Sequence, residues 1–367
     1  MLPPELFDAI IAQIDDVHTV NACSLVCKSW LATTRHRVFQ PFVVALRPQN
    51  AVEFMQLLGH SHATIRPYIH TVELLCSESS QKYELQWLDT ILAILTTLPS
   101  LDALLFENIS WDELSACAQT TLLNDFRGIT RLHLRASEFT SVNNLLRLVC
   151  SKPALQSLSC DNLGWEVVET EAEIAPTMLR HLRLAGCYER DILDWLLSHP
   201  PVPSIHILEL GAVRPEDTHS IGRFLHRLGP TLHQLHLEFW SLDPGGDAED
   251  FCARVDLAHN PALHTFYLDK FIHYSTYRFS SAIGWIPQLI APARGLTRLV
   301  LGLAIAHVGQ LQPEDDPIDW PALDHAFCHL PCVEFRVQGA VPLADVSAAL
   351  AELLPRCNVN GALRFRN

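Results

Sequence analysis

The chain has 367 residues, of which 49% are hydrophobic and 18% are charged, and it carries a formal net charge of −15 at pH 7. This length and apolar content support a large core and exclude a wholly disordered chain. The negative charge opposes contact with nucleic-acid backbones and with anionic membrane surfaces, so we expect no nucleic acid and no membrane as partner.

The eleven cysteines are scattered along the chain and odd in number. Dense, even-numbered cysteines in a short chain would indicate a disulfide framework, whereas this pattern indicates reduced thiols in a cytoplasmic or nuclear protein. The N-terminus lacks the basic and apolar segments of a signal peptide. The uncharged stretch 279–293 is too short to span a bilayer and contains two prolines, so we expect a soluble protein.

Three short helices are predicted within residues 1–38. Pro3 and Pro4 suit the first turn of a helix, where a missing N–H group has no intrahelical partner to lose. Apolar residues then recur at helical spacing and form one stripe: Leu6, Phe7, Ile10, Ile11 and Ile14. Two further helices are expected near residues 20–25 and 28–36. Helices of this size make too small a core to be stable alone, so we expect them to pack on the rest of the chain, on another protein, or on both.

A six-residue pattern, apolar-x-x-apolar-x-apolar, recurs along the rest of the chain and predicts short strands. Ten segments follow it well: 69–74, 101–106, 129–134, 155–160, 179–184, 205–210, 232–237, 263–268, 296–301 and 332–337. Segments 39–44 and 360–365 are weaker copies, which brings the expected strands to twelve. The segments start 24 to 36 residues apart, so the repeats are unequal in length.

Segments with helical periodicity lie between the predicted strands: 84–95, 141–150, 189–199, 216–228, 247–257 and 343–354. Strands that alternate with helices in this way are parallel and stack into a right-handed βα solenoid. The expected fold class is therefore α/β, with about twelve irregular repeats, a parallel sheet on the concave face and helices on the convex face. A doubly wound α/β enzyme is the alternative, but it would need longer apolar strands and a Gly-rich phosphate loop.

Residues 179–187, LRHLRLAGC, match the pattern Leu-x-x-Leu-x-Leu-x-x-(Asn/Cys). By this match the chain resembles the leucine-rich-repeat family in its long form, with helices on the convex side. Other repeats place different residue types at the position of Cys187: Ser137, Val213, Trp240 and Phe271. The resemblance implies that residues 39–367 form the solenoid, with an N-terminal capping repeat at 39–68 and the C-terminal repeats and cap at 332–367.

The start of the chain reads LPPELFDAIIAQI, and LVCKSW follows at 25–30. These blocks resemble the F-box: Leu-Pro-x-Glu-Leu, an apolar helix, and then Leu-Val-Cys-Lys-x-Trp. The resemblance implies that residues 1–38 form an F-box, which binds the adaptor subunit of SCF-type cullin–RING ubiquitin ligases. It also implies that ten positions form the core of this module or contact the adaptor: Leu2, Pro3, Pro4, Leu6, Ile10, Ile14, Leu25, Val26, Cys27 and Trp30. A set of capping helices is the alternative, but capping does not explain the second block.

Motifs for catalysis, nucleotide binding and metal binding are missing from the sequence, so we expect no catalytic residue, no cofactor and no metal. Residues 325–332, HAFCHLPC, have metal-like spacing, but no second ligand cluster follows, and we expect Cys328 and Cys332 to be buried in the core. Histidines recur within and beside the predicted strands, and we expect scattered surface residues in preference to a titrating cluster.

Strand alternation predicts which side chains face solvent on the concave sheet. The charges along it run from basic at 131–183 to acidic at 209–269 and mixed after 298. Ten residues are the candidate contacts for a protein substrate: Arg131, His133, Arg135, His181, Arg183, Glu209, His236, Glu238, Tyr267 and Asp269.

The function expected from these resemblances is substrate recognition for an SCF-type ubiquitin ligase, without catalysis by this chain. The expected partners are the adaptor, the cullin and RING subunits reached through it, and an unknown protein substrate. A leucine-rich-repeat scaffold or regulatory protein that binds partners without ubiquitylation is the alternative. Binding of the adaptor through residues 2–30 distinguishes the two.

Overall fold

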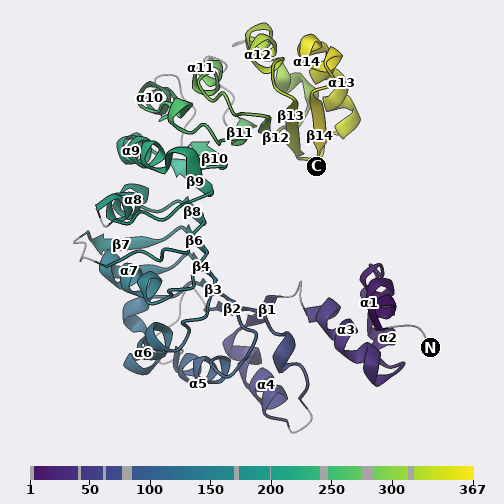
Figure 1. Ribbon diagram of the computed structural model, residues 1–367, viewed down its shortest axis with the longest axis vertical. Coiled ribbons are helices and arrows are strands. Elements are labelled where there is room, and N and C mark those ends of the chain that lie inside the picture. Colours follow the sequence, from purple (N-terminus) through teal and green to yellow (C-terminus); the bar gives the residue numbers. More distant parts are fainter. Residues whose placement is uncertain are drawn as a thin grey trace. The chain divides into compact units, whose positions relative to one another are not determined.

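The computed structural model describes residues 4–39, 43–60, 63–76, 85–168, 173–198, 200–239, 247–273, 285–312 and 318–367. Within them the chain is mixed α/β. Twelve parallel strands follow in the order β1-β2-β3-β4-β6-β8-β9-β10-β11-β12-β13-β14, and β5 pairs with β7 in a separate two-stranded sheet (Figure 1). The chain divides into two compact units, Met1–Ser159 with Leu163–Pro176, and Cys160–Asn162 with Thr177–Asn367.

Three helices open the first unit: α1 (Pro4–Ala12), α2 (Val17–Ser24) and α3 (Lys28–Phe39). Asp16 is the N-cap of α2, because its carboxylate accepts hydrogen bonds from the backbone N–H groups of His18 and Thr19 at 3.3 and 2.8 Å. The structure thus contains a helix at each of the three predicted places within residues 4–39.

Strands and helices alternate through the rest of the first unit. Its elements are β1 (Val43–Leu46), α4 (Pro48–Gly59), β2 (Thr71–Leu75), α5 (Gln86–Leu95), β3 (Ala103–Glu107), α6 (Ala116–Asn124), β4 (Arg131–Arg135), β5 (Glu138–Ser141), α7 (Val142–Cys150), β6 (Ser157–Asp161) and β7 (Gly164–Val167). Helix α7 shows why these segments are helical: Ser141 caps its first turn, and Val142, Leu145, Leu146 and Val149 are buried on one face. Strand β6 ends in the second unit, since residues 160–162 belong there.

The second unit continues the alternation. Its elements are β8 (His181–Ala185), α8 (Glu189–Ser198), β9 (Ile207–Val213), α9 (Thr218–Leu228), β10 (Gln234–Phe239), α10 (Asp247–Arg254), β11 (Thr265–His273), α11 (Ile286–Ile290), β12 (Arg298–Ala304), α12 (Trp320–Phe327), β13 (Cys332–Gln338), α13 (Leu343–Leu353), α14 (Pro355–Val359) and β14 (Leu363–Arg366). Consecutive strands from β8 to β14 pair in parallel, for example Leu182 with Leu208 and Leu208 with Leu235. A parallel sheet with a helical crossover after most strands is the arrangement of a βα repeat solenoid.

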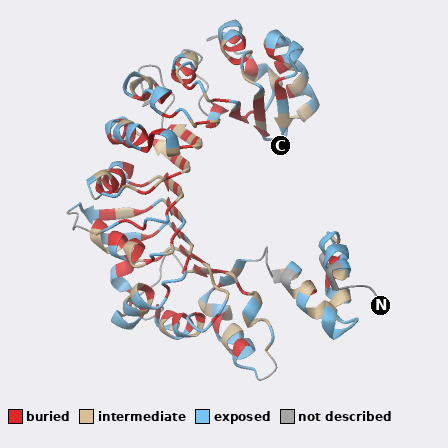
Figure 2. Ribbon diagram, viewed as in Figure 1, coloured by how far each residue is buried: buried red, intermediate tan, exposed pale blue. Residues whose placement is uncertain are grey.

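Burial alternates along the strands of both units. In β4 and β8 the leucines are buried, whereas the residues between them are half-buried or exposed (Figure 2). The leucines pack toward the helices, and the alternate residues lie on the other face of the sheet, which we call the open face. Each six-residue segment predicted from the sequence overlaps one strand of the large sheet, and each strand ends one or more residues beyond the segment.

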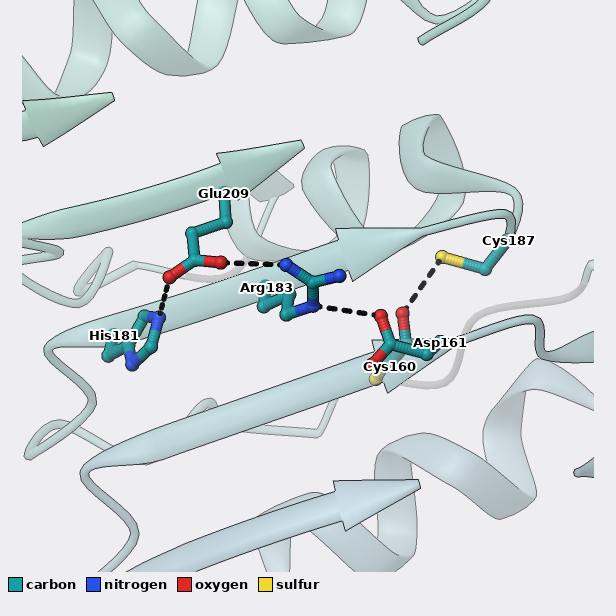
Figure 3. Close-up of polar contacts among 6 residues, drawn as sticks. All are labelled: Cys160, Asp161, His181, Arg183, Cys187 and Glu209. Atoms are coloured by element: carbon teal, nitrogen blue, oxygen red, sulfur yellow. Dashed lines mark hydrogen bonds and ion pairs between the residues drawn. The ribbon is translucent and has the colours of Figure 1, made fainter. Parts of the chain in front are cut away.

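The turn after several strands has a left-handed backbone that the sequence pattern did not predict. Asn108, Ala136, Asn162 and Gly186 each follow a strand by one residue and have φ of 57°, 47°, 53° and 63°. Glycine adopts this conformation most readily, and a Cβ at position 186 would also lie 2.2 Å from Oδ1 of Asn162, whose side chain would have to move. The buried Cys187 follows, and its thiol donates to the carbonyl oxygen of Cys160 at 3.9 Å, as Figure 3 shows.

The pair β5–β7 is a second departure from the predicted repeat of strand, turn and helix. Residues Glu138 and Phe139 pair in parallel with Gly164 and Trp165. This pair forms where two successive turns each extend far enough to add a short strand beyond the main sheet.

Among the described residues, no helix combines the length and apolarity that a membrane crossing requires.

Candidate functional site

Large apolar side chains are exposed on the N-terminal helices. Leu6 and Ile10, one turn apart on α1, are 48% and 51% exposed, and Leu25 and Val26, in the turn between α2 and α3, are 87% and 64% exposed. We call these four residues the exposed apolar set. Such residues are candidates for contact with another protein, because leaving them in water forgoes the free energy gained by burying them.

Different residues form the interior of the same helices. Ile11 and Val20 are 1% and 3% exposed, and the buried Thr34 donates through its hydroxyl to the carbonyl oxygen of Trp30 at 2.8 Å. The rings of Phe7 and Trp30 lie 5.4 Å apart. The single apolar stripe predicted for α1 is therefore split, with Ile11 directed inward and Leu6 and Ile10 outward.

The remaining positions predicted for adaptor contact are distributed as follows. Leu2 and Pro3 lie outside the described residues, and Pro4 begins α1. Ile14 and Trp30 are half-buried. Cys27 is exposed, and a hydrogen bond with Ser29, followed by the N–H of Trp30, lowers the pKa of its thiol. The sequence did not separate the exposed residues of this group from the half-buried ones.

In the first unit, the predicted open-face residues Arg131, His133 and Arg135 all lie on that face of β4. Arg131 donates to Oδ1 of Asp102 at 3.0 Å and to the hydroxyl of Thr71 at 3.2 Å, and Arg135 pairs with Glu107. Each arginine thus has one acidic partner in its own unit.

In the second unit, three of the predicted residues form one network with Asp161 (Figure 3). Arg183 donates through Nε to Oδ1 of Asp161 at 3.0 Å and through Nη1 to Oε2 of Glu209 at 2.8 Å. Nε2 of His181 lies 2.9 Å from Oε1 of Glu209. Burial raises the pKa of the Glu209 carboxyl, but the hydrogen bonds from His181 and Arg183 outweigh burial and lower it to about 2. Glu209 is therefore ionised at neutral pH, and its two oxygens hold the guanidinium of Arg183 and the imidazole of His181.

The prediction that the open-face residues are exposed to solvent is wrong for Tyr267, whose side chain is only 8% exposed. The imidazole of His236 stacks on its ring at 3.7 Å between centroids, and the guanidinium of Arg336 lies 5.0 Å from the ring centroid. The two neighbours cover the aromatic ring. Burial lowers the pKa of His236 to about 4, so this imidazole is neutral at pH 7.

Glu238 and Asp269, the other two predicted residues, lie beside this stack. Glu238 forms an ion pair with Lys270. Burial, and then the nearby charge of Glu238, raises the pKa of Asp269. All seven predicted residues of the second unit thus lie on one face of neighbouring strands, but the structure divides them between the network of Figure 3 and the stack around Tyr267.

The open face after residue 298 carries both signs of charge, as expected, but arginine is in excess. Strand β14 pairs with β13 so that Arg364 lies opposite Glu334 and Arg366 opposite Arg336. The open face of β12–β14 therefore carries four arginines, Arg298 included, and one glutamate. Sequence analysis missed the last two arginines because the segment that contains β14 matched the strand pattern weakly.

Two further expectations need correction. The rings of His206 and His233 lie 4.9 Å apart in an edge-on arrangement, and those of His233 and His264 lie 5.8 Å apart, so these histidines form a row and are not scattered. They lie side by side because each comes one residue before its strand, and the strands are parallel neighbours. Cys328 and Cys332 are half-buried and not in the core. No group of three or more potential metal ligands lies together in the described part of the chain.

Comparisons with known proteins identify no family. No family model matches the sequence, and no curated protein matches it. Among solved structures, 32 chains match, one of which is a crystal structure of a Bacteroides fragilis protein. That structure has 12% sequence identity and a TM-score of 0.24, over 89% of this chain and 72% of the other. A similarity at this level supports no statement about function.

Proposed function

We propose that this chain is a substrate-recognition subunit of an SCF-type ubiquitin ligase. Residues 1–38 form an F-box that binds the adaptor, and residues 39–367 form a leucine-rich-repeat solenoid whose open face binds a protein substrate. The chain itself performs no catalysis, and it acts in the cytoplasm or the nucleus.

The exposure of Leu25 and Val26 carries this proposal. Both residues belong to the Leu-Val-Cys-Lys-x-Trp block, yet they do not contribute to the interior formed around Ile11 and Val20. Aliphatic residues that are not needed for folding, and are placed at a turn between two helices, suit an interface with another protein. Capping helices alone would leave these side chains without a role.

The proposed mechanism is positional. The adaptor links the chain to the cullin and RING subunits, and a substrate held on the open face would then be kept close to the ubiquitin-conjugating enzyme. Tethering of this kind raises the effective concentration of substrate lysines near the reactive thioester.

The test is binding of purified adaptor to the full chain, measured by isothermal titration calorimetry. Leu25→Asp with Val26→Asp is expected to weaken binding by about 100-fold or more, because two charges would be desolvated in an apolar contact. The matched control is Val52→Asp with Leu57→Asp on α4, whose side chains are 54% and 52% exposed and which should leave binding unchanged. Absence of adaptor binding by the unmodified chain would reject the ligase subunit and favour the scaffold.

A further inference from the structure

The last three strands of the second unit concentrate positive charge. Strands β12, β13 and β14 contain four arginines, Arg298, Arg336, Arg364 and Arg366, and a single acidic residue, Glu334. The strand register brings all five to the open face. We call the four arginines the C-terminal arginine cluster.

Glu334 lies beneath these arginines. Its side chain is 2% exposed, and it accepts hydrogen bonds from Arg298 at 2.6 Å and from Arg336 at 3.3 Å, with Arg366 at 3.7 Å. Burial raises the pKa of the Glu334 carboxyl, but the two hydrogen bonds outweigh burial and lower it. The glutamate is therefore charged, and it holds several guanidinium groups close together.

The arginines keep unused capacity for an anion. Each guanidinium has five N–H donors, whereas Glu334 offers only two oxygens. The side chains of Arg336 and Arg366 are 43% and 66% exposed. With four positive charges and one negative charge, these strands carry an excess of three positive charges, and Asp269 on β11 offsets only part of the charge of Arg336.

The cluster differs from the other arginines of the open face. Arg131 and Arg135 each pair with one acidic residue, and Arg183 pairs with two. The chain as a whole carries a net charge of −15. An excess of positive charge held together on such an acidic chain points to a ligand of opposite charge, because like charges at close range destabilise a fold unless something offsets them.

We propose that the C-terminal arginine cluster binds an acidic segment of a partner protein through its aspartate and glutamate carboxylates. This inference rests on the proposed use of the open face for substrate binding. Guanidinium forks match carboxylates in shape and charge, and the buried Glu334 already occupies such a position among three of these arginines. Tyr267, beneath Arg336, fixes one member of the cluster in place.

The test is fluorescence anisotropy of a fluorescein-labelled hexa-aspartate peptide with the full chain, at about 50 and about 300 mM NaCl. We expect saturable binding that weakens about tenfold or more in Arg364→Gln with Arg366→Gln, and weakens at the higher salt concentration. Arg364 and Arg366 are exposed, and their replacement leaves the hydrogen bonds from Arg298 and Arg336 to Glu334 in place. If the double variant melts early, Arg366→Gln alone should weaken binding in the same direction.

Arg131→Gln with Arg135→Gln is the matched control, since it removes the same charge from the open face of the other unit. This variant should change peptide affinity less than about twofold, the scale of a net-charge effect alone. Equal losses in the two double variants, or no binding by the unmodified chain, would overturn the proposal. Binding of a phosphoserine peptide with no binding of hexa-aspartate would overturn the choice of carboxylates. None of these measurements involves the adaptor, so their failure is distinct from failure of the ligase proposal.

Discussion

The N-terminal helices and the strands of the repeats use the same apolar residue types in opposite ways. Leu25 and Val26 are 87% and 64% exposed, whereas Leu182 and Leu184 in β8 are fully buried. The repeats cover one another's apolar faces along the chain, because each strand has a parallel neighbour and a helix packed beside it. The three short helices have no such continuation. The same residue types therefore complete a core in one region and remain exposed to solvent in the other.

The largest effect is expected for a charge placed inside a repeat. Leu132→Asp on β4 should lower the free energy of unfolding by more than about 4 kcal/mol, because Leu132 is 2% exposed and an unpaired carboxylate would be buried. Its neighbour Arg131 lies on the open face, and Arg131→Gln should cost less than about 1 kcal/mol. Thermal unfolding followed by circular dichroism measures both. Equal losses would show that the two faces of β4 are wrongly assigned.

Truncations within the N-terminal helices should separate their interior from their exposed residues. Ile11→Ala removes a side chain that is 1% exposed and should destabilise the helices by about 2–4 kcal/mol. Val26→Ala should change stability by less than about 0.5 kcal/mol, since most of its side chain is already in water. Hydrogen–deuterium exchange of peptides from residues 4–39 reports this region alone. Faster exchange in Val26→Ala than in Ile11→Ala would contradict the assignment.

The open face should make stability depend on mildly acidic pH through His236. Its folded pKa of about 4 lies below the value near 6.5 of an unfolded histidine, so the unfolded chain binds the proton first as the pH falls. The free energy of unfolding should therefore fall between pH 6.5 and pH 4, by about 1–2 kcal/mol after allowance for solvent screening. In His236→Gln this part of the pH dependence should be missing, whatever the variant's stability at pH 7. Urea unfolding across this range provides the measurement, and an unchanged slope would refute the role of His236.

A smaller effect at lower pH is expected from Glu209. Its folded pKa of about 2 lies below the unfolded value near 4.3, so its stabilising contribution is complete above pH 4.3 and is lost as the pH falls toward 2. Glu209→Gln, which removes the charge that binds Arg183 and His181, should cost about 1 kcal/mol at pH 7, because Arg183 is partly exposed. The same variant should lose the acid-dependent part of the unfolding free energy between pH 4.3 and pH 2. A variant as stable as the unmodified chain at pH 7 would show that the network of Figure 3 contributes order but no net stability.

The periodicity of the sequence was sufficient to locate the strands of the large sheet, their two faces and six of the helices between them, but not α4, α6, α11, α12 or α14. A leucine at every second position of β4 or β8 has only one face to occupy once the other side of the strand is polar, so burial follows from local pattern. The exposed residues of the N-terminal helices were named among the site residues, but the sequence did not separate them from the buried and half-buried residues of the same helices. Helical spacing groups Leu6, Ile10 and Ile11 on one stripe, and only the packing of α1 against α3 directs Ile11 inward.

The remaining features depend on distances between residues that are far apart in the sequence. Glu209 meets His181 and Arg183 because β8 and β9 are neighbours in a defined register, and Arg364 and Arg366 join Arg298 through the pairing of β14 with β13. The row of His206, His233 and His264 and the burial of Tyr267 beneath His236 and Arg336 arise in the same way. The sequence by itself determined the alternation of strands and helices, because that alternation is local. Only the tertiary structure decided which charges meet on the open face, because strand register is set by the packing of whole repeats and not by the residues of any one strand.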